Sequence, residues 1–301
     1  MNRRDFIIRS VLALLGISLP LKKNIIARAL AADNVAPDII VSRGQAPPVV
    51  TEAAIRALGG MKRFVSRGDR VIIKPNIGWD RTPEMAATTN PDVVATLTRL
   101  CRDAGAKEVL VFDRTINDAR RCYRQSGIEE AVTAAGGVMH FVDDRKFRDV
   151  TINGLALTKW PLYTEIFEAD AFINVPIAKI HSLADLTLGM KNLMGVMGGW
   201  RGRIHQRLDE SIVDLAATVP VTLVVLDAIR ILIRNGPQGG RLEDVRRLDT
   251  VIAGTDQVAV DAYGTTLFGM RGADIGAVRL GAENGIGTAD LSALTVRKIE
   301  S

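Results

Sequence analysis

After residue 37 the chain alternates between short apolar runs and longer amphipathic segments, and this alternation constrains the fold more than any other feature. The short runs are rich in Val, Ile and Leu, which is typical of buried strands. We expect strands at 38–43, 70–76, 108–113, 138–143, 170–176, 221–227 and 250–256. We expect helices near 50–65, 91–104, 118–135, 183–193, 209–218, 257–268 and 274–284. Such alternation indicates an α/β fold with a mainly parallel sheet and helices on both of its faces.

The composition fits a buried sheet. The chain is 47% hydrophobic but only 5% aromatic, so its core must consist mainly of Val, Ile, Leu and Ala. A length of 301 residues is enough for one large domain or for two lobes. We expect a single α/β domain over residues 38–301, in which two lobes could divide near residues 144–160. That segment is either irregular or a small hairpin around Asn153 and Gly154.

The N-terminal segment resembles a twin-arginine export signal. Arg3 and Arg4 precede Phe6 and Ile7, a modest apolar stretch follows, and the small residues of "ARALAAD" offer a cleavage site. We therefore expect residues 1–31 to be a signal peptide that the twin-arginine translocase reads. The mature protein would then be periplasmic or otherwise extracytoplasmic.

The charge distribution argues against nucleic acid as a partner. Residues 1–31 hold six basic side chains and one acidic side chain, which accounts for the whole formal charge of +5. The remainder is formally neutral and offers no general footprint for a phosphate backbone. No segment outside the signal has the length and apolarity of a transmembrane helix, so we do not expect an integral membrane protein after processing.

Polar residues stand where several predicted strands end. Lys74 and Asn76 lie two apart at the end of one strand, Lys179 and His181 follow another, and Asp227 ends a third. Residues two apart in an extended segment point to the same side, and open parallel sheets bind ligands beyond the carboxyl ends of their strands. We therefore expect these side chains to gather at one edge of the sheet and to bind a ligand there.

Two further strands end in aspartates, Asp113 and Asp256. An aspartate in this place often caps the helix that follows, and we interpret both as helix caps. Asp261, five residues after Asp256, falls inside a predicted helix and would be a buried carboxylate. We count Asp261 among the candidate ligand-binding residues.

Lys191 and Asn192 lie in a segment that is otherwise apolar. If residues 183–193 are helical, Thr187 and Lys191 share one stripe of that helix. A lysine in such surroundings forms an ion pair, extends its amine to solvent or loses its charge. A neutral lysine is a nucleophile. Lys191 is therefore a candidate catalytic residue and Asn192 a candidate ligand-binding residue.

Two of the three histidines bracket this lysine. His181 precedes Lys191 by ten residues, and His205 follows it by fourteen. A histidine can carry a proton at physiological pH or bind a metal ion. We consider His181 a candidate catalytic acid or base.

Cys101 and Cys122 are the only cysteines. Two thiols do not supply the four thiolates that an iron–sulfur cluster usually needs, which argues against such a cluster. In an oxidising compartment the two could form a disulfide. Cys101, however, lies in the apolar helical pattern "VVATLTRLCRDAG", which favours a buried structural thiol.

Several of these stretches together resemble domain-of-unknown-function family 362. They are "IIKPN", "INVPIAKIHSLADLTLGMKNLMGV", His205, "VVLDAI", "GPQGG" and "DQVAVDAYGTTLFG". The resemblance extends from about Ile39 to the C-terminus, and its most specific motif is Lys-x-His followed by Lys-Asn. The family has no settled general activity.

A weaker similarity concerns the nickel-pincer lactate racemases, in which a His, a Lys about ten residues later and a second His occur in the same order. By this resemblance His181 would carry a proton, Lys191 would hold an organic cofactor covalently and His205 would bind its transition metal. Those racemases use a pair of proton-carrying histidines. The remaining histidine here, His140, lies inside a predicted strand, so the second carrier has no clear counterpart.

Two functions fit this pattern. The first is an exported enzyme that binds a small anionic substrate, or an organic or metal cofactor, in a Lys/His cleft and performs proton-transfer or redox chemistry. The second is a non-catalytic periplasmic carrier that holds such a ligand for a partner. Only the first requires that Lys191 contribute more to turnover than to binding.

Overall fold

A computed structural model describes residues 37–301 of the protein. The expected signal peptide, residues 1–31, lies outside the described residues. Within the described part, no helix has both the length and the apolar character that a membrane crossing requires.

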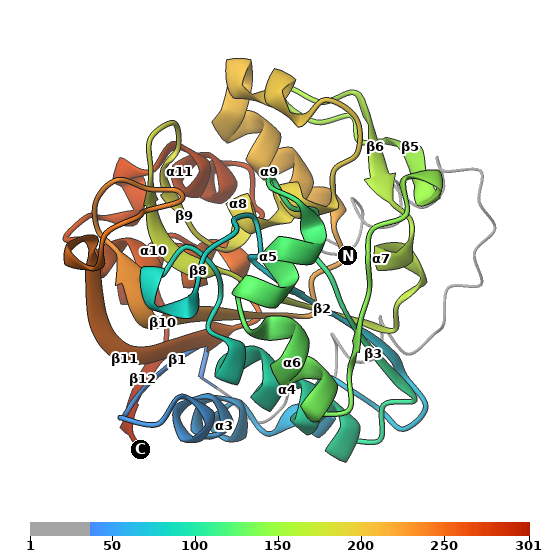
Figure 1. Cartoon of the computed structure of the whole chain (residues 1–301). Helices are drawn as coiled ribbons and strands as arrows, with labels where there is room; N and C mark the ends of the chain where they lie inside the picture. The colour runs from blue at the N-terminus through green and yellow to red at the C-terminus, as the bar shows by residue number, and fades with distance from the viewer. Residues whose placement is uncertain (1–36) are drawn as a thin grey trace.

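A ten-stranded sheet runs through the described part of the chain (Figure 1). Its strands are β1 (Ile39–Arg43), β2 (Arg70–Pro75), β3 (Glu108–Val111), β4 (Val138–Met139), β7 (Ala171–Val175), β8 (Ile177–His181), β9 (Asp185–Thr187), β10 (Leu223–Leu232), β11 (Val245–Gly254) and β12 (Val296–Glu300). The main order is β12-β1-β11-β10-β7-β2-β3-β4, while β8 pairs with β10 and β9. The pairs are parallel except for β1–β11, β10–β11 and β8–β9.

Helices cover both faces of this sheet. They are α3 (Pro47–Ala57), α4 (Pro91–Asp103), α5 (Ala119–Gln125), α6 (Ile128–Ala134), α7 (Glu165–Glu168), α8 (Gly189–Asn192), α9 (Leu208–Thr218), α10 (Gln257–Thr266) and α11 (Gly276–Glu283). Successive strand residues face opposite sides, so Val71 and Ile73 join the core under α3, α4 and α6, while Ile72 joins the core under α9, α10 and α11. Figure 1 shows these two groups of helices apart from each other. The predicted α/β class is confirmed.

All seven predicted strands are present, although β4 is shorter than expected. The single helix predicted over 118–135 is wrong. The chain breaks at Gly127, whose φ of 70° lies in the left-handed region that favours glycine. Two short helices, α5 and α6, result.

The helix predicted over 183–193 is also wrong. β8 and β9 form a hairpin there, and the chain turns at Asp185 with a φ of 53°. Thr187 lies in β9 opposite Lys179 and does not share a helical stripe with Lys191. Within this segment only the four residues of α8 are α-helical.

The hairpin expected as one alternative near Asn153 is confirmed. β5 (Phe147–Thr151) and β6 (Lys159–Tyr163) form a separate antiparallel pair. Both carboxylate oxygens of Asp214, on α9, accept backbone N–H groups from the loop between the two strands. The division of the domain into two lobes near 144–160 stays a prediction.

Side chains cap the starts of two helices, and the cap predicted at Asp256 is confirmed. The Asn90 side chain accepts the Asp92 N–H at the start of α4, at 2.9 Å. The Asp256 carboxylate accepts the Ala259 N–H at the start of α10, at 3.0 Å. Each of these contacts satisfies a backbone donor that the first turn of a helix leaves without a partner.

Both cysteines are buried and free. Burial raises the pKa of the Cys101 thiol, and it raises the pKa of Cys122 to about 11. Both side chains therefore remain protonated thiols at neutral pH. Cys101 lies on the buried face of α4, as expected for a structural thiol.

Candidate functional site

Four cations from distant parts of the chain interact near the carboxyl ends of the central strands. They are Lys74 in β2, Lys179 in β8, Lys191 in α8 and Arg201, the first residue of the 3₁₀ helix η5 (Arg201–Arg207). The charges of Lys74 and Lys191 lower the pKa of Lys179, and the charge of Arg201 lowers the pKa of Lys74 and of Lys191. We call these four side chains the basic cluster. The structure thus brings together the three lysines that the sequence singled out.

Lys74 is fully buried and forms an ion pair with Asp113, with 2.9 Å between Nζ and Oδ1. Asp113 lies just beyond β3, and its Oδ2 accepts the Ile77 N–H at 2.7 Å. The interpretation of Asp113 as a helix cap is wrong, because α5 begins later and is capped by Asp118. Gly195 lies against this pair, and a Cβ there would stand 1.9 Å from Asp113 Oδ1.

Lys179 is buried and bonds only to uncharged acceptors. Its Nζ donates to Asn76 Oδ1 at 3.0 Å and to the Ala87 carbonyl at 2.5 Å. Lys179 and Asn76 are 103 positions apart in the sequence. Their contact joins β8 to the carboxyl end of β2, the meeting that the strand-end pattern predicted.

Asparagine side chains extend this contact to α8. Asn76 Nδ2 donates to Asn192 Oδ1 at 3.0 Å, and Asn192 Nδ2 donates to Asn174 Oδ1 at 2.8 Å. Asn174, in β7, donates to the Gly189 carbonyl at 2.8 Å. Because each amide both donates and accepts, the network fixes the orientation of every member. Asn192 therefore positions the short helix that carries Lys191.

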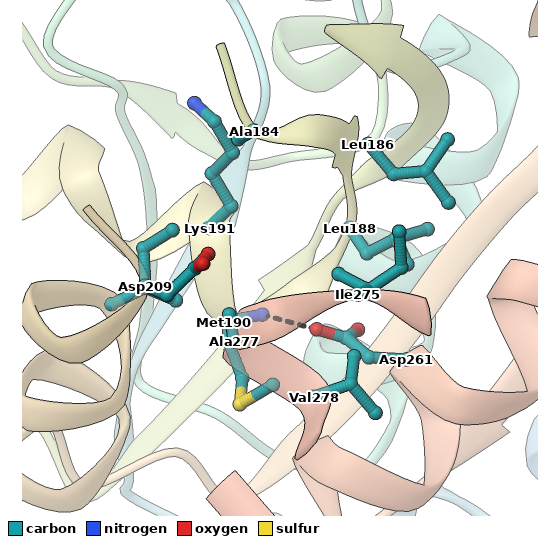
Figure 2. Close-up of a pocket in the computed structure, with 11 residues that line it drawn as sticks. Ala184, Leu186, Leu188, Met190, Lys191, Asp209, Asp261, Ile275, Ala277 and Val278 are labelled. Carbon is teal, nitrogen blue, oxygen red and sulfur yellow. Dashed lines mark hydrogen bonds between the residues drawn. The ribbon is translucent and has the colours of Figure 1, made fainter. Parts of the chain in front are cut away.

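The two lysines nearest α8 have lowered pKa values. Burial, followed by the charge of Lys191, lowers the pKa of Lys179 to about 7. Burial, followed by the charge of Arg201, lowers the pKa of Lys191 to about 8. The residue Lys191 is half-buried, and the hydrogen-bond partner of its amine is the Met194 sulfur at 3.6 Å. Figure 2 shows this amine extended away from the Asp261 carboxylate.

His181 ends β8 and is half-buried. Burial and the charges of Lys191, Lys179 and His205 lower its pKa to about 3, so the ring is neutral at physiological pH. Its Nδ1 faces the Leu183 N–H at 3.1 Å and must accept that hydrogen bond. The proton of the neutral ring is therefore on Nε2, which is a hydrogen-bond donor.

His205 is exposed on η5, and its Nδ1 lies 3.0 Å from the Gly202 carbonyl. Its charge acts on His181, so the two rings are in electrostatic range of each other. Among residues 37–301 no three His, Cys, Asp or Glu side chains lie together as metal ligands would. A metal held by protein ligands alone does not fit this donor set, and the assignment of His205 as a metal ligand stays a prediction.

Asp261 lies beneath α8 rather than in the basic cluster. Its oxygens accept the Gly189 N–H at 2.6 Å and the Met190 N–H at 2.8 Å, as Figure 2 shows for Met190. It lines a mainly apolar pocket with Lys191 and Asp209. The free volume is about 10 Å³, enough for one water molecule. Burial raises the pKa of Asp261 to about 7.

Asp227 is buried in β10, and backbone donors occupy both of its oxygens. Oδ2 accepts the Asn90 N–H at 2.7 Å, and Oδ1 accepts the Ile229 N–H at 2.9 Å. Burial raises its pKa to about 6. In this geometry Asp227 ties the start of α4 to the sheet, and its role in ligand binding stays a prediction.

Sequence reasoning missed Arg201 and Asn174. The Arg201 guanidinium donates to the carbonyls of Arg114 and Thr115, at 2.9 and 3.0 Å. The available signal was the position of this cation in the glycine-rich stretch "GGWRGR". Asn174 is the one polar residue in the strand segment "AFINV", a signal for a buried hydrogen-bonding role.

A thylakoid-associated protein from Synechocystis sp. is 32% identical to this chain over 217 residues. The match covers 69% of this chain and 65% of the relative. The chain therefore spans slightly less than two thirds of the length of this relative.

Two solved structures align with part of this chain at low similarity. The lactate racemase apoprotein from Thermoanaerobacterium thermosaccharolyticum has 9% identity and a TM-score of 0.41, with 76% of this chain and 56% of that chain covered. A Thermotoga maritima protein has 11% identity and a TM-score of 0.40, with 78% and 59% covered. Similarity at this level does not indicate a shared activity.

The family described as a domain of unknown function, DUF362, matches residues 71–266. The matched region runs from β2 to the end of α10 and contains the whole basic cluster, both candidate histidines and the asparagine network. It covers well over half of the chain. The chain therefore belongs to the DUF362 family.

Proposed function

We propose that this chain binds a small anionic ligand at the basic cluster and acts on it as an enzyme. The observation that carries the proposal is the pair Lys179 and Lys191, two amines in a dry region whose hydrogen-bond partners are all uncharged. Asp113 forms its ion pair with Lys74. The other cations of the basic cluster therefore leave an excess of positive charge. A buried anion would compensate this excess, since buried charges are stable only when paired.

The residues have distinct parts in this proposal. Lys191, the least enclosed of the three lysines, contacts the ligand or reacts with it. The Nε2–H of His181 donates to a ligand oxygen and stabilises negative charge that develops there. Asn76 holds Lys179 in place, and Asn192 fixes the short helix that carries Lys191.

A cofactor also fits these candidate roles. By the racemase-like order of residues, the amine of Lys191 would hold an organic cofactor, and His205 would contribute one ligand to its metal. The lowered pKa of Lys191 suits a nucleophilic tether. No step of the proposed function depends on such a group.

Replacing Lys191 by methionine should weaken oxalate binding at pH 7 at least tenfold. A charge-assisted hydrogen bond contributes about 1.5–3 kcal/mol, and about 1.4 kcal/mol is a tenfold change in affinity. Isothermal titration calorimetry measures the effect. Wild-type affinity should also decline from about pH 6 to about pH 9, because lysines with a pKa of about 7 and about 8 lose their charge over this range.

The matched control is Lys107→Met. Lys107 is exposed and precedes β3, at the opposite edge of the sheet, so its loss should leave oxalate affinity unchanged. Equal losses in the two variants would mean that the oxalate is attracted by general charge and not by the basic cluster. In a carrier the Lys191 variant loses affinity alone, whereas an enzyme loses turnover far more than affinity.

We also propose that the protein is exported and works outside the cytoplasm. The support is the paired Arg3 and Arg4 ahead of an apolar stretch, and the thylakoid association in the name of its Synechocystis relative agrees with such a location.

Replacing both Arg3 and Arg4 by lysine should leave most of the protein unprocessed in the cytoplasm, because the translocase reads the arginine pair and not charge alone. Cell fractionation with intact-mass measurement detects the precursor. The pair Lys22→Arg and Lys23→Arg is the control and should be exported as usual. Normal export of the Arg3 and Arg4 variant would exclude this route.

A further inference from the structure

Lys191 differs from the other two lysines of the basic cluster in how its amine is held. Lys74 is 0% exposed and bonded to Asp113, and Lys179 is 1% exposed and bonded to two oxygens. Lys191 is half-buried, and its amine meets only the weakly accepting sulfur of Met194. It is therefore the one lysine of the cluster that can approach a ligand atom without first breaking a strong contact.

We propose that the Lys191 amine forms an imine with the carbonyl carbon of a small 2-oxo acid. This inference rests on the proposed anion site and names its substrate class. The amine nitrogen attacks the carbonyl carbon, and the C–N bond forms as the π electrons move to oxygen. Both amine protons then leave with that oxygen as water, and a C=N bond remains. The exchange needs no oxidant, reductant or further reactant.

The surroundings of Lys191 favour this reaction. Its amine has a pKa of about 8 against an ordinary value of 10.5, so at pH 7 the neutral, nucleophilic form is about three hundred times more abundant than for an ordinary exposed lysine. A lysine that is desolvated beside other cations is the usual form of an imine-forming amine. The neighbouring charges of Lys179 and Arg201 complement the carboxylate of a 2-oxo acid.

The same geometry selects Lys191 over Lys179 as the nucleophile. Lys179 has the lower pKa, about 7, but its amine is enclosed and its bonds to Asn76 and Ala87 set the position of β8 against β2. Attack by Lys179 would require this network to open. Lys179 instead supplies positive charge beside the reacting amine.

The test is reductive trapping with glyoxylate and sodium cyanoborohydride, followed by peptide mapping of the full chain. We expect Lys191 to be modified about a hundredfold faster than the exposed Lys107 at pH 7, because burial and the charge of Arg201 leave more of the Lys191 amine neutral and able to attack, and we expect oxalate to slow the modification of Lys191 alone. The Lys191→Arg variant keeps the charge and should lose the fast phase, while Lys107→Arg should retain it.

The outcomes separate this inference from the proposed function. If oxalate binds the wild type but Lys191 is modified no faster than Lys107, imine formation is excluded and the anion site stands. If oxalate does not bind and labelling is uniform over exposed lysines, both the imine and the anion site are excluded. Because the wild-type peptide map reports on Lys191 directly, the result does not depend on how well the arginine variant folds.

Discussion

Replacing Asp113 by asparagine should lower the free energy of unfolding by about 3–5 kcal/mol, the usual effect of removing one partner of a buried ion pair. Lys74 is 0% exposed and its amine lies 2.9 Å from Asp113 Oδ1. Asparagine keeps an acceptor for the Ile77 N–H but leaves the ammonium without its counter-charge. Gly195 closes the space beside the pair, so water cannot easily replace the lost carboxylate.

Urea denaturation of two further variants tests the explanation. Asp149→Asn removes an exposed ion pair with Lys159, in which both side chains are 57% exposed, and should cost less than about 1 kcal/mol. The double variant Lys74→Met with Asp113→Asn should recover much of the loss, because it leaves no unpaired charge in the interior. A loss in the double variant that equals the sum of the single losses would show that the pair does not act as a unit.

The sheet and its helices were predictable because periodicity is a local property. Val71, Ile72 and Ile73 read as one continuous apolar run, which is what a strand covered on both faces requires. The helix predicted over 183–193 was wrong for the opposite reason. The apolar spacing of this segment suits either a helix or a hairpin. The hairpin forms because β8 pairs with β10, 50 residues later in the sequence, and a local pattern cannot reveal such a distant partner.

The part of the candidate site that lies at strand ends was predictable from the sequence. Lys179 and Asn76 meet because parallel strands bring their carboxyl ends to one edge. The partner of Lys74 was not predictable, since an aspartate after a strand equally suits a cap. Arg201 escaped notice because its place in the cluster depends on the carbonyls of Arg114 and Thr115, which belong to a different loop.

Asp261 links the stability of the fold to the placement of Lys191. Its carboxylate holds the first two N–H groups of α8, and Gly189 approaches so closely that a Cβ there would stand 2.7 Å from Asp261 Oδ1. The asparagine network holds the far end of the same helix through Asn192. The reactive lysine thus stands on one helical turn that is fixed at both ends by buried polar groups.

The contribution of Asp261 to the stability of the fold should depend strongly on pH. Burial raises its pKa in the folded state to about 7, although the bonds from Met190 and Gly189 oppose the rise, whereas an unfolded aspartate has a pKa of about 3.9. Between these values the folded state binds more protons than the unfolded state. The contribution of Asp261 to stability is therefore fully present below about pH 4 and is lost as the pH rises towards about 7.

The Asp261→Asn variant should lack this dependence. From about pH 4 to about pH 7, the stability of the wild type relative to the variant should fall by about 3 kcal/mol, with a slope that approaches about 1.4 kcal/mol for each pH unit midway between the two pKa values. Urea denaturation at a series of pH values measures the difference. Asp290→Asn is a control of opposite sign, because hydrogen bonds from Ser292 lower the pKa of Asp290, so its stabilisation is lost as the pH falls. Parallel stability curves for the wild type and Asp261→Asn would mean that Asp261 keeps an ordinary pKa, and that its bonds to α8 offset the whole effect of burial.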